Sequence, residues 1–227
     1  MTLPLAVIWS AVIALFALGG AWYVRAFNRS DAILAFYVTL AVASSIFASK
    51  TISFDFGFAE FFAPGAVLIF SVTFLLTDII NEKFGKKEVY RMILLGLLAQ
   101  VAFLVFSYLV LNAAAAPFFT NQAAFEAVFG MVPRIVLAGL LAFLVSELLD
   151  ANLYQWLRTL TGGKHLWMRN VFSSLPAMAI DSVVFVSFAF WGVMPLLPLV
   201  IGLTVTKWLV GIVDIPFMYA ARAIMRR

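Results

Sequence analysis

The stretch RNVFSSLPAMAIDSVVFVSFAFWG, residues 169–192, is apolar over a length that can cross a bilayer and carries Asp181 at its middle. A helix of about 20 apolar residues spans the hydrocarbon core, so this stretch predicts a transmembrane helix. A carboxylate at that depth is expensive and needs a partner, an aqueous cavity or a ligand. We expect Lys207, inside the last apolar run, to be the partner, with Asp214 one heptad further along.

The composition of the whole chain is that of an integral membrane protein. Of its 227 residues, 65% are hydrophobic and 11% are charged, whereas soluble domains carry roughly 25% charged residues. Strands of an outer-membrane barrel would alternate in polarity over about ten residues. Unbroken apolar runs recur here instead, which predicts an all-α, polytopic fold in a lipid bilayer. The net charge of +4 does not indicate a nucleic-acid partner, because the basic residues fall between the apolar runs.

The apolar runs predict seven membrane spans. They cover approximately residues 3–24, 33–49, 61–80, 92–112, 132–149, 171–191 and 197–220. A signal peptide is the alternative for the first run, but the run is long and no positive side chain precedes it, which favours a retained helix. Pro64, Pro176 and Pro216 each fall within a predicted span, so we expect kinked helices.

The basic residues predict how the spans are oriented. If the amino terminus lies outside, all but three of the 15 Lys and Arg residues fall in cytoplasmic loops or at the cytoplasmic carboxyl terminus. The three exceptions, Lys50, Arg134 and Lys207, lie at outer helix ends or within a helix. The positive-inside rule therefore favours this orientation for a multi-pass protein of the cell (inner) membrane.

The sequence contains no signature of an enzyme. The patterns GxxxxGK[ST], HExxH, GxSxG and GxGxxG are all missing, as is cysteine, and the single histidine, His165, lies in a basic loop. We therefore expect no catalytic residues, no cofactor and no metal site.

The polar residues in and beside the spans are the candidates for function. Asp181 and Lys207 form either a structural ion pair or a pair that faces a substrate cavity. A second group shares helix faces by its spacing at predicted cytoplasmic ends: Asp78, Asn81 and Glu82 on one helix, Glu147 and Asp150 on another. Its acids either pair with Lys83, Lys86, Arg91 or Arg158 or belong to a gating cluster.

Five blocks of sequence carry a resemblance to a known family. They are SSIFASK (44–50), PGAVLIFSVTFLLTDIINEKFG (64–85), the segment 134–154 with LLD at 148–150, Arg169 and Asn170 followed by Asp181 and Phe185, and Lys207 followed by VDIPFMY (213–219). In this order they resemble the putative vitamin uptake transporter family, whose members include bacterial queuosine precursor transporters.

The resemblance implies a fold and a cargo. Residues 31–227 would form a six-helix core related to the substrate-binding subunits of energy-coupling-factor transporters, and residues 1–30 would add one helix. The cargo would be a queuosine precursor, 7-cyano-7-deazaguanine or 7-aminomethyl-7-deazaguanine, taken up for tRNA modification. The substrate-binding positions carried over are Asp181, Lys207, Glu147, Asn170, Lys50 and Asp214, and the helix-end or gating positions are Asp78, Asn81, Glu82 and Asp150.

Departures from the family pattern leave the ligand open. Ser45, Glu147 and Met178 stand where the family usually has amides. A carboxylate, Asp181 or Glu147, can accept both N1–H and the exocyclic amine of a guanine-like base. Lys207 or Asn170 would meet its carbonyl, and phenylalanine rings would stack on its face.

Other functions remain open at this point. The rival cargo is another nitrogenous base or a vitamin, with proton coupling through Asp181 or Glu147, and the rival role is that of a membrane scaffold. Because the chain has no ATPase motif, a homo-oligomer or a separate energising module are the further partners to consider.

Overall fold

The computed structural model describes residues 3–55, 59–160 and 166–226, and within them the chain is mostly helical with one β-hairpin. The elements in chain order are α1 (Leu3–Phe27), α2 (Asp31–Phe47), β1 (Thr51–Asp55), β2 (Glu60–Pro64), α3 (Val67–Phe84), α4 (Lys86–Asn112), α5 (Gln122–Phe129), α6 (Val132–Leu160), α7 (Leu166–Phe190) and α8 (Leu196–Arg226). The expectation of a helical membrane protein is confirmed, with the β-hairpin as an addition to the expected helices.

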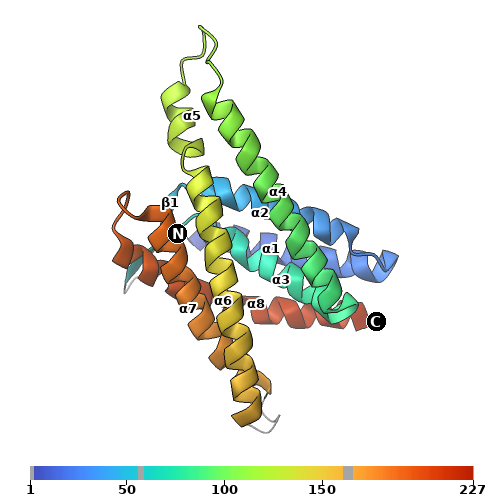
Figure 1. Cartoon of the computed structure of the whole chain (residues 1–227). Coiled ribbons are helices and arrows are strands. Elements are labelled where there is room, and N and C mark those ends of the chain that lie inside the picture. The colour runs from blue at the N-terminus through green and yellow to red at the C-terminus, as the bar shows by residue number, and fades with distance from the viewer. Residues whose placement is uncertain (1–2, 56–58, 161–165, 227) are drawn as a thin grey trace.

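The long helices run in two directions. In Figure 1, α1, α2, α3 and α8 run across the view, whereas α4, α6 and α7 cross them steeply. Helix α3 packs on α1, α2, α4 and α8, and α7 packs on α6 and α8. Because α8 contacts both α3 and α7, it joins the two groups of helices.

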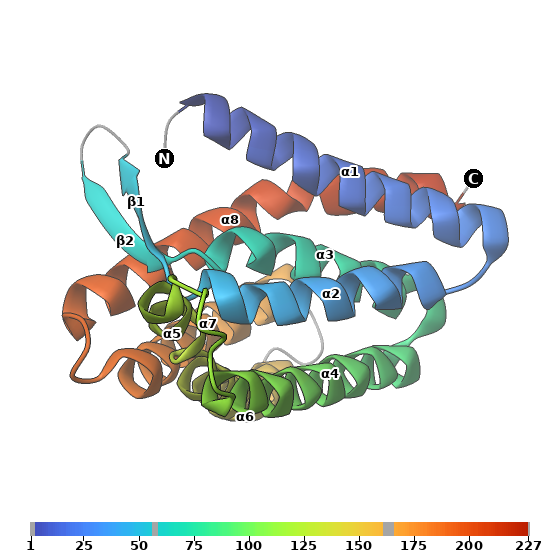
Figure 2. The ribbon, with the colours of Figure 1, turned by 90° about the horizontal axis from the view of Figure 1, so that it is seen from above.

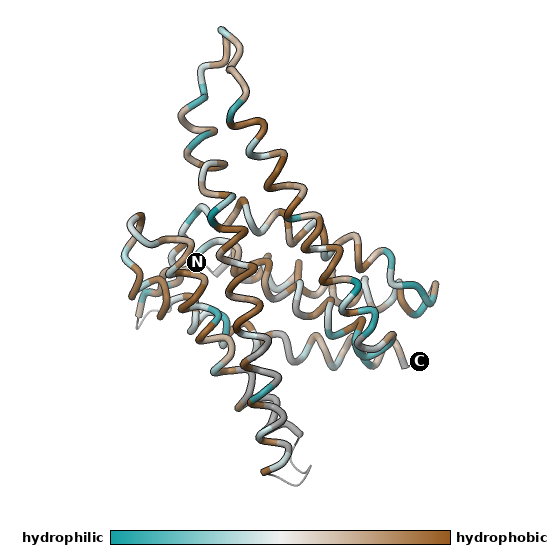
Figure 3. The backbone as a smooth tube through the Cα atoms, viewed as in Figure 1, coloured by the Kyte–Doolittle hydropathy of each residue, from teal (hydrophilic) through white to brown (hydrophobic). Residues whose placement is uncertain are grey.

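The helices α1, α2, α3 and α8 have two ends that differ in the parts of the chain they carry. Figure 2 shows the carboxyl terminus and the α1–α2 connection at one end, and the amino terminus and the hairpin at the other. The α3–α4 break also lies at the first end, where Gly85 adopts a φ of +80° that glycine tolerates best. The hydropathy colouring in Figure 3 is teal at this end and brown along most of α4.

Four helical segments among the described residues are long and apolar enough to cross a membrane. They are Val7–Phe27, Lys87–Asn112, Gln122–Ser146 and Leu196–Met225, and two shorter apolar helices cover Asp31–Phe47 and Leu175–Phe190. The protein is therefore a multi-pass membrane protein, and the count of seven spans stays a prediction.

One predicted span begins in the wrong place. Residues 61–80 were expected to be one helix, but Glu60–Pro64 form a strand that pairs antiparallel with Thr51–Asp55, and the helix starts only at Val67. Pro64 disfavours helical geometry at the residue before it, and the aromatic residues Phe54, Phe61 and Phe62 suit a pleated ribbon. Pro176 and Pro216 do lie inside helices, in α7 and α8.

Among the described residues, two clusters of buried apolar side chains form the interior. The first joins α1, α2 and α3, with Leu75, Leu76, Ile79 and Ile80 of α3 at its centre. The second joins the hairpin to α6, α7 and α8, and Phe190 is its largest fully buried side chain.

Candidate functional site

An ion pair between Asp181 on α7 and Lys207 on α8 is the centre of the candidate site. The Lys207 ammonium contacts Oδ2 of Asp181, and the side chains are 7% and 20% exposed. A buried charge without a partner is strongly unfavourable, so the opposite charges of the two residues compensate each other. The predicted pairing of Asp181 with Lys207 is confirmed.

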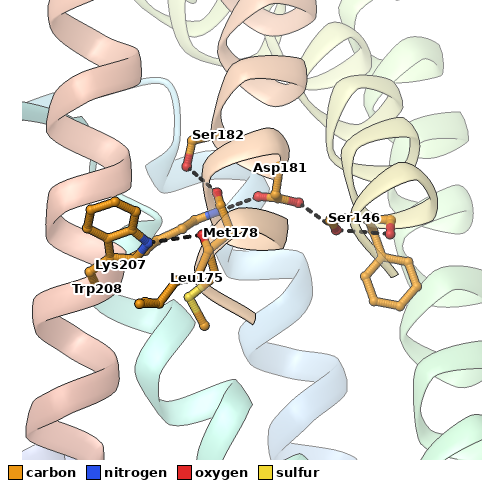
Figure 4. A network of polar contacts seen from close by, with 8 residues as sticks. Ser146, Leu175, Met178, Asp181, Ser182, Lys207 and Trp208 are labelled. Atoms are coloured by element: carbon orange, nitrogen blue, oxygen red, sulfur yellow. Dashed lines mark hydrogen bonds and ion pairs between the residues drawn. The ribbon is translucent and has the colours of Figure 1, made fainter. Parts of the chain in front are cut away.

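Helix α6 contributes a hydroxyl to the same carboxylate. The Ser146 Oγ lies 3.3 Å from Oδ1 of Asp181 and 3.1 Å from the main-chain carbonyl of Phe143, so its single proton has two acceptors available. Figure 4 shows Ser146 and Lys207 on opposite sides of the carboxylate. Three helices thus meet at one acid.

Helix α3 adds an aromatic face beneath the cation. The Nζ of Lys207 lies 4.8 Å from the centroid of the Phe70 ring. A ring face attracts a cation through its quadrupole, most effectively where water is excluded. Lys207 therefore has two partners, Asp181 on α7 and Phe70 on α3.

Hydrogen bonds around the pair fix the positions of α7 and α8. Trp208 Nε1 donates to the carbonyl of Leu175, 3.2 Å away, which ties α8 to α7 at the residue directly before Pro176. The buried Ser182 hydroxyl donates to the Met178 carbonyl at 2.9 Å within α7 itself. These bonds, drawn in Figure 4, lie close to Asp181 and Lys207 and help to fix the backbone of the helices that carry them.

Sequence reasoning missed Ser146 and Phe70 as neighbours of this pair. Serine is common in membrane helices, and the chain has 24 phenylalanines, so neither residue type stands out. The sequence offers one signal for Ser146, which is its position directly before the candidate residue Glu147.

The α3 end carries the second predicted group. Asp78, Asn81 and Glu82 are all exposed there. Glu82 Oε1 lies 2.7 Å from Nε of Arg222 on α8. Arg222, 140 positions later in the sequence, was not among the expected partners of Glu82. The side chains of two expected partners, Lys86 and Arg158, lie outside the described residues.

Lys50 lies away from the ion pair, in the turn that follows α2. It is exposed and lines a cavity of about 260 Å³ together with residues of α2, β1 and α3. Asp181 and Lys207 do not line this cavity. The structure thus separates Lys50 from the pair with which it was grouped.

Four further candidates have side chains outside the described residues. They are Glu147, Asp150, Asn170 and Asp214, and only their backbone is placed, in α6, α7 and α8. Their predicted roles stay predictions.

Comparison with known proteins decides the family. The profile of the family described as "Putative vitamin uptake transporter" matches residues 64–221. The chain belongs to this family. The vitamin uptake transporter match spans α3 to α8 and so includes both Asp181 and Lys207. It leaves α1, α2 and the turn with Lys50 outside.

A curated bacterial relative supports the assignment to the vitamin uptake transporter family. The chain is 31% identical over 161 residues to a protein of Bacillus subtilis (strain 168) named "Probable queuosine precursor transporter", which covers 68% of this chain and 69% of the relative. No solved structure matches the chain. The protein is thus a membrane transporter of this family, and the matched region includes the charged pair of α7 and α8.

Proposed function

We propose that this transporter takes up queuosine precursors, 7-cyano-7-deazaguanine or 7-aminomethyl-7-deazaguanine, into the cytoplasm across the inner membrane. The observation that carries the proposal is the Asp181–Lys207 pair inside apolar helices that belong to the matched family. The name of the Bacillus subtilis relative supports this choice of cargo. Ionisable groups at such depth mark pathways for polar solutes.

The chemistry of the pair suits a base with two adjacent N–H donors. An ionised carboxylate offers about four lone-pair directions, and Ser146 and Lys207 use two of them. A guanine-like base can donate N1–H and its exocyclic amine to the others, and these charge-assisted bonds are strong where water is excluded. Lys207 is then the donor for the carbonyl of the base.

The remaining predicted residues have supporting roles in this proposal. Glu147 and Asn170 are the alternative readers of the base edge, Asp214 lies one heptad beyond Lys207, and Asp78, Asn81, Glu82 and Asp150 act at the cytoplasmic end. The partner of the transporter, a second copy or an energising module, is a separate question from its cargo.

The proposed topology has seven spans, with the amino terminus outside and the carboxyl terminus in the cytoplasm. Its support is the clustering of the α1–α2 connection, the α3–α4 break and the carboxyl terminus at one end of the molecule (Figure 2). Arg29, Arg91 and Arg222 belong to these parts of the chain, as the positive-inside rule requires of a cytoplasmic end. The relation of the six-helix core to energy-coupling-factor subunits belongs to the same proposal.

Uptake of labelled 7-cyano-7-deazaguanine by proteoliposomes that contain the full chain tests the proposed cargo. Asp181→Asn and Lys207→Met should each lower the uptake at least tenfold, because each leaves one donor or acceptor of the site unmatched. Glu126→Gln is the matched control, since Glu126 accepts a hydrogen bond from Gln122 within the short helix α5. Normal uptake by both site variants would refute the site, and no uptake by the unaltered chain would refute the cargo.

The family description favours one second candidate. It is a vitamin, because the matched family is described as one of vitamin uptake transporters. A vitamin with adjacent N–H donors and a carbonyl would make the same contacts with the pair. Competition of unlabelled vitamins against the labelled base separates the two candidates.

A further inference from the structure

The Asp181 carboxylate has a cation on one side and a hydroxyl on the other. The Lys207 ammonium of α8 contacts Oδ2, and the Ser146 Oγ of α6 lies 3.3 Å from Oδ1. Figure 4 shows these two partners on opposite sides of the acid. Four polar groups therefore follow one another across the three helices in a fixed order, which is ammonium, Oδ2, Oδ1 and hydroxyl.

The Ser146 hydroxyl can turn its proton away from the acid. Its Oγ lies 3.1 Å from the main-chain carbonyl oxygen of Phe143, which precedes it by one turn of α6. A hydroxyl has one proton and two lone pairs, and the proton rotates to suit its neighbours. When the proton is donated to the Phe143 carbonyl, the Ser146 Oγ becomes a hydrogen-bond acceptor directly beside Oδ1 of Asp181.

The packing of α6 on α7 sets Ser146 opposite Asp181. Arg134 of α6 donates to two carbonyls at the end of α7, and a Cβ at Gly139 would lie 3.9 Å from the Phe185 ring. These contacts precede the one at Asp181 in order along the two antiparallel helices. Ser146 and Asp181 are both half-buried, so neither residue is sealed in the packing. The hydroxyl is thus part of a pre-formed arrangement that a ligand can reach.

A guanine-like base carries four groups in the matching order along one edge. They are its carbonyl oxygen, its N1–H and the two N–H bonds of its exocyclic amine. With the carbonyl at the Lys207 ammonium, N1–H donates to Oδ2 of Asp181 and the nearer amine N–H donates to Oδ1. The second amine N–H then points past Oδ1, toward the side on which Ser146 lies. Without an acceptor there it would be left unpaired away from water, which is costly.

We propose that the Ser146 Oγ accepts this second amine N–H, so that Ser146 makes the transporter select bases with a 2-amino group. The inference rests on the proposed function, because it takes a guanine-like base at Asp181 from there. It adds the orientation of the base, with the carbonyl toward α8 and the amine toward α6. Ser146 is then a specificity-determining residue in direct contact with the cargo.

A comparison of two ligands in nanodiscs that contain the full chain tests this inference. They are 7-cyano-7-deazaguanine and the analogue that lacks its 2-amino group, and the readout is the ratio of their Kd values. The unaltered chain should prefer the amino base. Ser146→Ala should lower this preference by about fivefold, the loss expected for one neutral hydrogen bond. A general disturbance of the site would weaken both ligands alike and leave the ratio unchanged.

Two further variants control for the hydroxyl and for the helix. Ser146→Thr keeps a hydroxyl that can still bond the preceding turn of the helix, so it should keep most of the preference. Thr159→Ala is the matched control, because the Thr159 Oγ1 donates to the Trp156 carbonyl at 2.7 Å. That bond is of the same kind on the same helix, about 20 Å further along. Both Kd values should stay unchanged in this variant.

An analogue with a 2-methylamino group supplies a test that loss of folding cannot imitate. Its methyl group replaces the second N–H and would collide with the Ser146 Oγ, so the unaltered chain should bind it more weakly than the amino base. Ser146→Ala removes that oxygen and leaves room for the methyl group. This variant should therefore bind the methylamino analogue more tightly than the unaltered chain does.

The outcomes separate this inference from the proposed cargo. If the unaltered chain binds 7-cyano-7-deazaguanine but Ser146→Ala leaves the Kd ratio as it was, the role of Ser146 is refuted and the cargo stands. Equal binding of the amino base and the analogue without the amine by the unaltered chain would refute it too. If the unaltered chain binds no base, the proposed cargo fails and the role of Ser146 fails with it.

Discussion

The ammonium of Lys207 lies 4.8 Å from the ring centroid of Phe70 while it also pairs with Asp181, so one cation from α8 joins α3 to α7. Helix α7 otherwise packs on α6 and α8. The pair therefore links the two groups of helices at the place where the transported solute is proposed to bind.

Removing both charges of the Asp181–Lys207 pair should cost less stability than the two single removals added together. Lys207→Met leaves a buried carboxylate unpaired and should lower the free energy of unfolding by about 3 kcal/mol or more. Asp181→Asn together with Lys207→Met should lose less than the sum of the two single variants, because neither charge is then left alone. Thermal unfolding in detergent measures this, and strictly additive losses would show that the two charges are not coupled in solution.

The Phe70 ring should act through Lys207. Phe70→Leu removes the ring face and should lower the stability by about 1 kcal/mol beyond the loss of apolar contact. In a Lys207→Met background this extra loss should disappear, since there is no cation left to attract. Phe16→Leu is the control, because Phe16 packs edge-on against Phe36. An equal effect of Phe70→Leu in both backgrounds would mean that the ring serves packing alone.

Gly202 should be required for the hairpin to lie on α8. A Cβ at this position would collide with the main-chain carbonyl of Phe62 and lie 2.7 Å from the Phe62 backbone N and C atoms. Gly202→Ala should therefore displace β2 and lower the stability by about 1–3 kcal/mol.

Gly211→Ala supplies the comparison for Gly202 on the same helix. No described atom lies within 4 Å of a Cβ there, so alanine should be neutral or slightly stabilising through its helix propensity. Limited proteolysis of the hairpin, read beside thermal unfolding, checks both variants. Hairpins of equal protease resistance would contradict the close contact of β2 with α8.

Arg134 should hold the end of α7. Its Nε donates to the Phe188 carbonyl at 2.7 Å and its Nη2 donates to the Trp191 carbonyl at 2.6 Å. A cation at a helix carboxyl terminus satisfies free carbonyls and favours the helix dipole. Arg134→Gln should therefore speed amide hydrogen exchange in the last turn of α7, and Arg134→Lys should have an intermediate effect because it cannot reach both carbonyls as a fork. Unchanged exchange in that turn would contradict the capping role.

The sequence locates some helices of this chain better than others. The apolar runs placed α1, α2 and α4 well, because hydrocarbon length and helical rise leave little freedom. They failed at residues 61–66, where Pro64 and Phe61, which pairs with Phe54 across the hairpin, lie inside an equally apolar run. Hydropathy does not distinguish a short apolar strand from the first turn of a helix.

The sequence by itself determined that the chain is a helical membrane protein and that Asp181 pairs with Lys207, because buried charges in lipid need partners and few candidates exist at that depth. The tertiary structure alone decided that Ser146 and Phe70 complete the pair, that Arg222 is the partner of Glu82, and that Lys50 lies in a cavity of its own. These contacts depend on the tilt and rotation of each helix. One residue along a helix turns a side chain by about 100°, and that rotation is set by packing between helices far apart in the sequence.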